Sequence, residues 1–233
     1  MPQWELLDEA SHSLTIEYSF RSKSTARAFA TRFADDELVI FSPPTGLEPA
    51  AFRELEAHGR VTALVAPNGF HHLGLGPALE AFPQATVYAP EGAARRVKKK
   101  QPALEIRPLS ELQARTHTPV RILDVPGYSV GEAWAIVETV AGPLWYVSDS
   151  CFNLAQVPEG LMAGLLFKWT KSGPGLCLNG VGNLFFLKDR AGYKQWFEAR
   201  LAEPPTLLVP AHGGVVRDDA LGNSLKTLLD ARL

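Results

Sequence analysis

Four residues of the types that bind metal ions follow short apolar runs of the sequence. They are His71, His72, Asp149 and His212, and the runs that precede them are typical of buried strands. Since neighbouring strands end along one edge of a sheet, side chains at those ends can meet at one site. Histidine and aspartate are ligands for zinc, iron and manganese. The pattern therefore predicts a metal site, although a strand-end histidine alone is more often a surface or capping residue, and an aspartate alone could simply form a turn.

The rest of the sequence predicts a sheet-rich core covered by helices. We expect strands at residues 38–41, 61–66, 86–89, 121–125, 133–139, 144–148 and 206–209, and helices at 48–58, 75–82, 91–100, 189–201 and 218–233. Residues 152–185 are expected to be irregular. Alternating strands and helices at both ends, with consecutive strands between them, predict an α/β (α+β) protein with helices outside the sheets. We expect a single domain spanning residues 1–233, because no linker or repeat interrupts the pattern.

The composition is that of an ordinary globular protein. Hydrophobic residues make up 46% and charged residues 21% of the chain, and the formal net charge is -2. Neither a nucleic acid nor a membrane is therefore an expected partner. Residues 1–13 include acids and lack the apolar run of a signal peptide, which predicts a cytoplasmic protein. The two cysteines, Cys151 and Cys177, are too few for a disulfide framework.

The order of these segments resembles the metallo-β-lactamase superfamily over nearly the whole chain. Its members have an Asp in an early loop, a Thr-His-x-His-x-Asp-His motif, a Pro-Gly-His turn, a Gly-Asp strand end and a final strand-end His. The counterparts here are Ser42–Pro44, Ala66–His72, Val125–Gly131, Ser148–Ser150 and Pro210–Gly213. The Pro-Asn-Gly-Phe-His-His sequence at residues 67–72 also resembles a divergent bacterial branch of the superfamily. The resemblance implies a four-layer αββα metallo-β-lactamase-like sandwich.

Three ligand positions of the family's first metal site are replaced in this chain. Pro67 and Gly69 stand where the second motif has histidines, and neither has a donor side chain. The third position is Tyr128, whose neutral phenol is a poor ligand. The resemblance therefore implies that the first metal site is lost. Tyr128 would instead be a catalytic residue that donates a hydrogen bond to an oxyanion at the rim.

The family's second metal site is largely retained. Its histidines correspond to His72 and His212, its bridging carboxylate corresponds to Asp149, and its aspartate is replaced by His71. These four residues would hold one divalent metal ion, with zinc expected first and iron or manganese as alternatives. Vicinal histidines reach one ion only from an irregular loop, because in a strand they would face opposite ways. The alternative is a metal-free polar pocket in which the histidines hydrogen-bond to Asp149 and Tyr128.

The resemblance implies a metal-dependent hydrolase acting on a small-molecule substrate, with Asp149 and Tyr128 as catalytic residues. In the family, water bound to the ion attacks a carbonyl or phosphoryl centre, and the ion lowers the pKa of this water from near 16 toward about 7. A tetrahedral ion with four protein ligands has no open position, so catalysis would need five-coordination or a loosely held Asp149. Two alternatives stay open. One is a non-catalytic protein that binds a small molecule on the same fold, and the other is redox chemistry at a single iron, which in this family uses the missing half-site.

Two further segments have alternative interpretations. The basic run Arg95–Lys100 is typical of a solvated helix face, and it could instead bind an anionic group of a substrate. Phe167, Trp169 and the leucines at 161, 165 and 166 are interpreted as core or as a homodimer contact. A pocket wall or a lid is the alternative for this second group.

Overall fold

Two β-sheets form the centre of the molecule. The computed structural model describes residues 2–21, 24–117 and 119–233. The first sheet has the strand order β1-β2-β3-β4-β5-β6-β7, and the second has the order β13-β12-β10-β9-β8 with β11 paired to β10. The strands of the first sheet are β1 (Glu5–Asp8), β2 (Ser13–Arg21), β3 (Ser24–Ala34), β4 (Glu37–Phe41), β5 (Arg60–Val65), β6 (Thr86–Ala89) and β7 (Arg107–Pro108). Those of the second sheet are β8 (Val120–Asp124), β9 (Ala133–Thr139), β10 (Gly142–Leu154), β11 (Gly175–Leu178), β12 (Leu207–Gly213) and β13 (Val216–Arg217).

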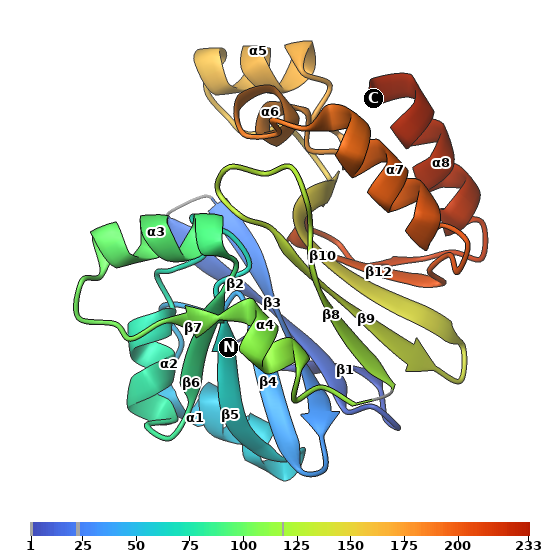
Figure 1. Cartoon of the computed structure of the whole chain (residues 1–233). Helices are drawn as coiled ribbons and strands as arrows, with labels where there is room; N and C mark the ends of the chain where they lie inside the picture. Colours follow the sequence, from blue (N-terminus) through green and yellow to red (C-terminus); the bar gives the residue numbers. More distant parts are fainter. Residues whose placement is uncertain (1, 22–23, 118) are drawn as a thin grey trace.

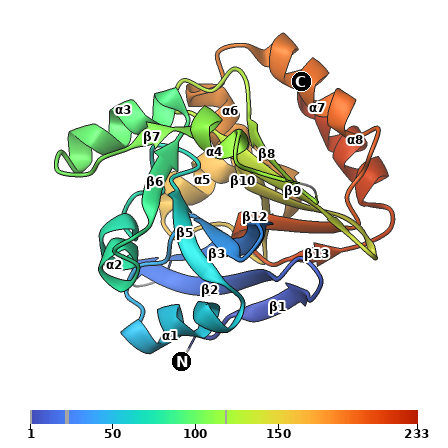
Figure 2. The ribbon, with the colours of Figure 1, turned by 60° about the horizontal axis from the view of Figure 1, so that its bottom comes forward.

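The helices lie outside the pair of sheets (Figures 1 and 2). They are α1 (Pro49–Arg53), α2 (Leu75–Ala81), α3 (Glu91–Lys100), α4 (Leu109–Gln113), α5 (Leu161–Trp169), α6 (Gly180–Phe185), α7 (Arg190–Arg200) and α8 (Leu221–Arg232), and a 3₁₀ helix, η1 (Glu54–Ala57), follows α1. Apolar residues of α1, α2 and α3 pack on the outer face of the first sheet. Those of α7 and α8 pack on the outer face of the second sheet. The layers therefore run helix, sheet, sheet, helix, which confirms the expected αββα sandwich.

Strand residues alternate between two apolar layers. Phe41 of β4 and Tyr146 of β10 belong to the cluster between the sheets. Their neighbours Ile40 and Trp145 face the outer helices instead. Because successive side chains of a strand point to opposite faces, strands that are buried on both faces appear in the sequence as continuous apolar runs. These runs are the reason the central strands could be predicted.

Aromatic contacts fix the two sheets against each other. The rings of Phe29 and Tyr146 are stacked with centroids 5.3 Å apart. The Tyr146 hydroxyl also shares a hydrogen bond of 2.7 Å with Oγ of Ser42. On the outer face of the second sheet, Trp134 meets Phe197 of α7 edge to face at 5.0 Å. These aromatic side chains bury large apolar areas and contribute strongly to the stability of the core.

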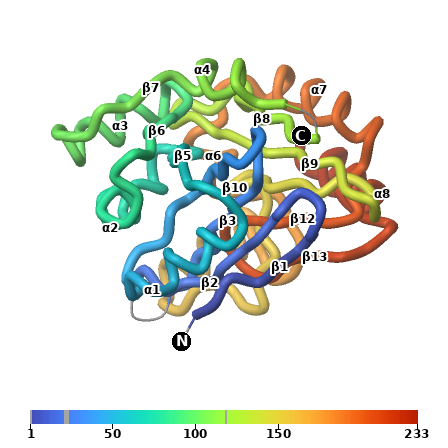
Figure 3. Tube along the Cα trace, turned by 90° about the horizontal axis from the view of Figure 1, so that it is seen from below, coloured from blue at the N-terminus to red at the C-terminus, as the bar shows by residue number. Residues whose placement is uncertain are grey.

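Each half of the chain builds one side of the molecule. The blue-to-green half forms the first sheet with its helices, and the yellow-to-red half forms the second (Figure 3). A site assembled from both halves therefore requires the two sheets to be packed together. In the described part of the chain, the helices are all too short or too polar to cross a membrane.

The structure differs from the predicted elements in several places. Residues 152–185 are not irregular, because they include the end of β10, α5, β11 and α6. The helix predicted at 48–58 changes to a 3₁₀ helix after Arg53. The N-terminal strands β1 and β2 were not predicted. Glycine-rich composition concealed the elements between 152 and 185, and the antiparallel β1–β2 pair depends on contacts that periodicity alone does not reveal.

Candidate metal centre

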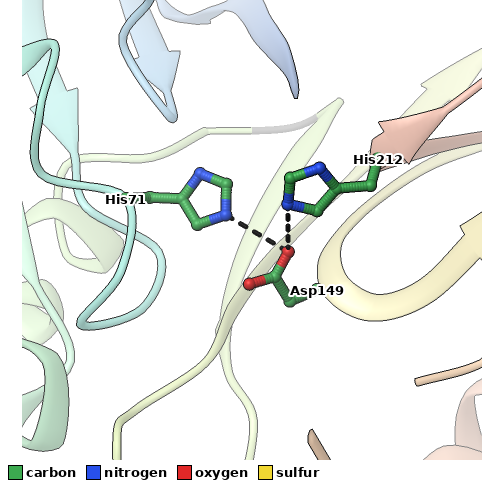
Figure 4. A group of neighbouring side chains, drawn as sticks. All are labelled: His71, Asp149 and His212. Atoms are coloured by element: carbon green, nitrogen blue, oxygen red, sulfur yellow. Dashed lines mark hydrogen bonds and ion pairs between the residues drawn. The ribbon is translucent and has the colours of Figure 1, made fainter. Parts of the chain in front are cut away.

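Three of the four predicted ligands lie together (Figure 4). Nε2 of His71 is 3.2 Å and Nε2 of His212 is 3.3 Å from Oδ1 of Asp149. The candidate ligand atoms of the three residues all lie within 4.8 Å of one another. The side chains of His71, Asp149 and His212 are 6%, 17% and 24% exposed, respectively. Two imidazole nitrogens and a carboxylate oxygen thus meet in a shielded position, and this donor set suits a divalent metal ion.

An irregularity in β10 turns Asp149 toward the histidines. Ser148 has a φ of 45°, a left-handed conformation that L-residues rarely adopt. The register between β10 and β12 shifts between Ser148 and Phe152, and Phe152 is paired with His212. Since β10 and β12 are parallel, their carboxyl ends lie side by side. The bulge and the strained residue therefore aim Asp149 at His212, as such features often do at functional sites.

The loop that carries His71 is fixed by its own backbone contacts. The Phe70 amide donates to Oδ1 of Asn68 at 2.9 Å. The Gly69 amide donates to the Val130 carbonyl at 3.0 Å. A Cβ atom at Gly69 would lie 2.5 Å from Cδ of Arg96, so this position has no room for a side chain. The loop is therefore held between β5 and α3, and His71 projects from it toward the second sheet.

His212 is oriented by a backbone carbonyl. Its Nδ1 lies 3.0 Å from the Thr25 carbonyl oxygen. A carbonyl only accepts, so Nδ1 carries the proton and Nε2 presents a lone pair to Asp149. Burial lowers the pKa of His212 despite the opposing charge of Asp149, which favours the neutral ring. Two acceptor atoms then face each other at 3.3 Å, and a cation between them would satisfy both. The residues present therefore fit a metal ion.

Asp149 is kept ionised by its surroundings. Burial alone would raise the pKa of its carboxyl group, but His71, His212 and a hydrogen bond from Asn68 outweigh burial and hold it well below its usual range. Nδ2 of Asn68 donates to Oδ2 of Asp149 at 2.9 Å and to Oε2 of Glu132 at 3.1 Å. The amide of Asn68 therefore separates two neighbouring carboxyl groups and orients the one that faces the histidines.

Glu132 and Asn68 are parts of the site that were not predicted from the sequence. Glu132 is only 2% exposed, and it accepts a hydrogen bond of 2.9 Å from the Asp149 amide. Burial, together with the negative charge of Asp149, raises the pKa of Glu132 well above its ordinary value. A signal was present, since Glu132 directly follows the turn Val125–Gly131. A charge at the start of a strand is ordinarily solvated, however, so its burial could be known only from the structure.

His72 lies outside the group that it was predicted to join. Its Nδ1 is 3.1 Å from the Phe70 carbonyl, within its own loop. Among the described residues, the group that could hold an ion contains His71, Asp149 and His212 and does not include His72. The two histidines are consecutive, so directing the His71 ring toward Asp149 leaves the His72 ring on a different side of the loop. The geometry supports three protein ligands for the predicted ion.

Tyr128 lies beside the site, but its hydroxyl is not free for the predicted role of hydrogen-bond donor to an oxyanion. Its hydroxyl donates a short hydrogen bond to Oδ1 of Asn183, so its single proton is already engaged. Its ring packs edge to face on Tyr193 at 5.3 Å. Burial raises the pKa of Tyr128 well above its ordinary value, which keeps the phenol neutral. Tyr128 could donate to an oxyanion only after giving up Asn183.

A cavity of about 130 Å³ lies beside Asp149 and reaches the surface. Tyr128 and Phe167 are both part of its wall, so Phe167 belongs to a pocket wall, as in the alternative interpretation. The core interpretation is wrong for Leu161, Leu165 and Trp169, which are 88%, 63% and 68% exposed. None of the described residues of α5 is buried. The helix covers the end of the sandwich, and its outer side faces solvent.

The basic run lies on α3. Lys98, Lys99 and Lys100 are exposed, as expected for a solvated helix face. The guanidinium carbon of Arg96 lies 4.2 Å from the centre of the Phe70 ring, a cation–π contact. Arg96 therefore supports the loop that carries His71, and it is not among the residues that line the cavity.

Solved structures share this fold, although sequence comparison finds no relative. No family model matches the chain, and no curated protein matches it. The metal-soaked Flv1 flavodiiron core from Synechocystis sp. PCC6803 is similar with a TM-score of 0.62 and 13% identity, over 98% of this chain and 61% of that one. The DIM-1 metallo-beta-lactamase exposed to ceftazidime has a TM-score of 0.60 and 12% identity, over 100% and 98%. The metallo-beta-lactamase from Pontibacter korlensis has a TM-score of 0.60 and 10% identity, over 99% of each chain.

These similarities establish the class of fold. The chain has a metallo-β-lactamase-like fold over essentially its whole described length. It spans about three fifths of the flavodiiron core, so the remainder of that protein has no counterpart here. Identities of 10–13% show the fold alone, and the function has to be argued from the site.

Proposed function

We propose that this chain is a metal-dependent hydrolase of small molecules that uses one divalent ion held by His71, Asp149 and His212. The convergence of His71 and His212 on Asp149 carries the proposal, because Nε2 of each imidazole lies within 3.3 Å of the same carboxylate oxygen, and this donor set suits a divalent cation. Zinc suits this donor set best, and iron or manganese would also be accepted. When bound, the ion would polarise a carbonyl or phosphoryl oxygen and lower the pKa of water.

The number of protein ligands supports catalysis over a structural role. Catalytic zinc sites commonly use three protein ligands and keep one position open, whereas structural sites use four. With His72 turned away, the site offers three. The five-coordination or loosely held aspartate that four ligands would require is then unnecessary.

The neighbouring residues would orient the reaction. Asn68 holds Oδ2 of Asp149, so Oδ1 stays directed at the two imidazoles. Asp149 also belongs to the wall of the cavity, where its ionised carboxylate would accept a hydrogen bond from the attacking water. Tyr128 lines the same cavity and would donate to an oxyanion after exchanging its partner Asn183. Substrate, water and the three ligands would thus meet at Asp149.

A non-catalytic binding protein is the second candidate. Two observations favour it: the Tyr128 proton is engaged by Asn183, and the ring of His71 is already within hydrogen-bond distance of Asp149. In this case the cavity would bind a small molecule without turnover.

Elemental analysis of the purified protein tests the proposal. We expect about one equivalent of metal in the wild type and almost none in His212→Ala, because loss of one of three ligands removes most of the affinity. His72→Ala is the matched control and should retain the metal, since its ring lies outside the group. Loss of metal in His72→Ala would instead support the four-ligand site predicted from the sequence. Metal-free wild type, even after supplementation, would contradict the hydrolase, and bound metal without hydrolysis of ester, thioester, amide and phosphoester panels would favour the binding protein.

A further inference from the structure

We propose that the cavity beside Asp149 binds an uncharged apolar or aromatic group of its ligand in preference to an anionic group. That this ligand is also the substrate rests on the proposed function, whereas the binding preference does not. The cavity measures about 130 Å³. An engineered apolar cavity of about 150 Å³ holds benzene, so one ring or a short branched chain would fill this one.

Four phenylalanines give the cavity its aromatic walls. They are Phe70, Phe152, Phe167 and Phe186, which come from four separate segments of the chain. Phe70 and Phe186 are in contact with centroids 5.2 Å apart, and Phe152 and Phe167 are nearly parallel with centroids 6.3 Å apart. Two aromatic pairs therefore border one space. Ligand sites in proteins are commonly built this way, from aromatic walls with a few polar groups that set the orientation.

The charges in the wall are unfavourable for anions. Asp149 and Glu132 are its acidic residues, and the described residues that line the cavity include no lysine, arginine or histidine. In the protein without a bound ion, a phosphate or carboxylate in this space would lie beside two carboxyl groups, with no basic side chain in the described wall to pair with, and such burial is strongly disfavoured.

The side-chain donors of Tyr128 and Asn68 in the wall are also engaged. The Tyr128 hydroxyl donates to Asn183, and the amide nitrogen of Asn68 donates to Asp149 and Glu132. A phosphate normally requires several free donors or a cation. These observations together favour an uncharged apolar group as the occupant.

The test compares one uncharged aromatic probe with two anionic aromatic probes in the whole chain after removal of metal with a chelator. Binding of benzamide, benzoate and phenyl phosphate is measured by ligand-observed NMR titration. We expect benzamide to bind at least about tenfold more tightly than either anion. Val181→Trp fills the cavity from its wall and should abolish benzamide binding. Val140→Trp is the matched control at a position that is 96% exposed, and it should bind benzamide as the wild type does.

Asp149→Asn provides a second variant in case Val181→Trp does not fold. It removes the negative charge but keeps the shape, so benzoate should gain affinity relative to benzamide. Benzoate binding as tightly as benzamide in the wild type would overturn the proposal, as would unchanged benzamide binding in a folded Val181→Trp. Failure of the proposed function can be distinguished from failure of this proposal. In the first case elemental analysis would find no metal, while the cavity would still prefer benzamide to the anions.

Discussion

Nε2 of His212 lies 3.3 Å from Oδ1 of Asp149. The other ring nitrogen donates to the Thr25 carbonyl, and Asp149 is ionised because His71, His212 and Asn68 lower its pKa despite burial. A divalent ion between the two atoms would bind both of them. The properties of the site should therefore depend on pH and on the groups that hold Asp149.

Metal retention should fall steeply with acid. Protonation of the two imidazole ligands competes with the ion, whereas the pKa of Asp149 is held so low that this carboxylate does not titrate in the same range. Free histidine titrates near about pH 6.5, so we expect the ion to stay bound at neutral pH and to be lost below about pH 5.5. Dialysis at stepped pH values followed by elemental analysis measures this. Full retention near pH 4 would show that the histidines are not the ligands.

Replacing Asn68 should destabilise the protein. Asn68→Leu leaves two buried carboxyl groups without their shared donor, and an unsatisfied buried polar group costs about 1–3 kcal/mol. Asn68→Asp should cost more, because it places a third carboxylate between Asp149 and Glu132. Urea denaturation of the metal-free proteins gives the free energies of unfolding. Asn153→Leu is the control, because its amide bonds to the Gly214 carbonyl in an exposed position, and equal losses at both sites would contradict the bridging role.

Glu132→Gln should change how stability depends on pH. Burial, followed by the charge of Asp149, raises the folded-state pKa of Glu132 above the unfolded value of 4.5. Between these two values the folded protein binds more protons than the unfolded chain, so the contribution of Glu132 to stability is present below about pH 4.5 and is lost as the pH rises. The variant lacks this loss and should gain stability relative to the wild type from pH 4 to pH 8. The urea midpoints of the variant and the wild type are compared across this pH range. A constant difference between them would disprove the prediction.

The exposed face of α5 should tolerate polar residues. Leu161→Ser and Leu165→Ser alter side chains that are 88% and 63% exposed, so each should change the free energy of unfolding by no more than about 0.5 kcal/mol. Leu225→Ala in α8 empties a fully buried position and should cost about 2–5 kcal/mol of the free energy of unfolding.

The two serine variants of α5 also test the predicted homodimer. If α5 forms that contact, analytical ultracentrifugation would show a dimer in the wild type and a monomer in the variants.

The sequence predicted the sandwich, and three of the four candidate ligands lie together in the structure. The features that could not be predicted have physical causes. Central strands such as β5 and β10 were recognisable because burial on both faces makes them apolar throughout. His71, Asp149 and His212 were recognisable because they follow such strands. The direction of the His72 ring depends on dihedral angles within one loop, which no residue pattern specifies. Glu132 is charged and buried, an exception to the rule by which the core was predicted.

The three candidate metal ligands come from both sheets. His71 follows β5 of the first sheet, whereas Asp149 and His212 lie on strands of the second. An ion held by all three would join the two halves of the chain as a reversible cross-link, and its binding free energy would become part of the folding free energy. At a free metal concentration one hundred times the Kd, this linkage amounts to about 2.7 kcal/mol. The melting temperature of the protein would then rise and fall with the metal supply around it.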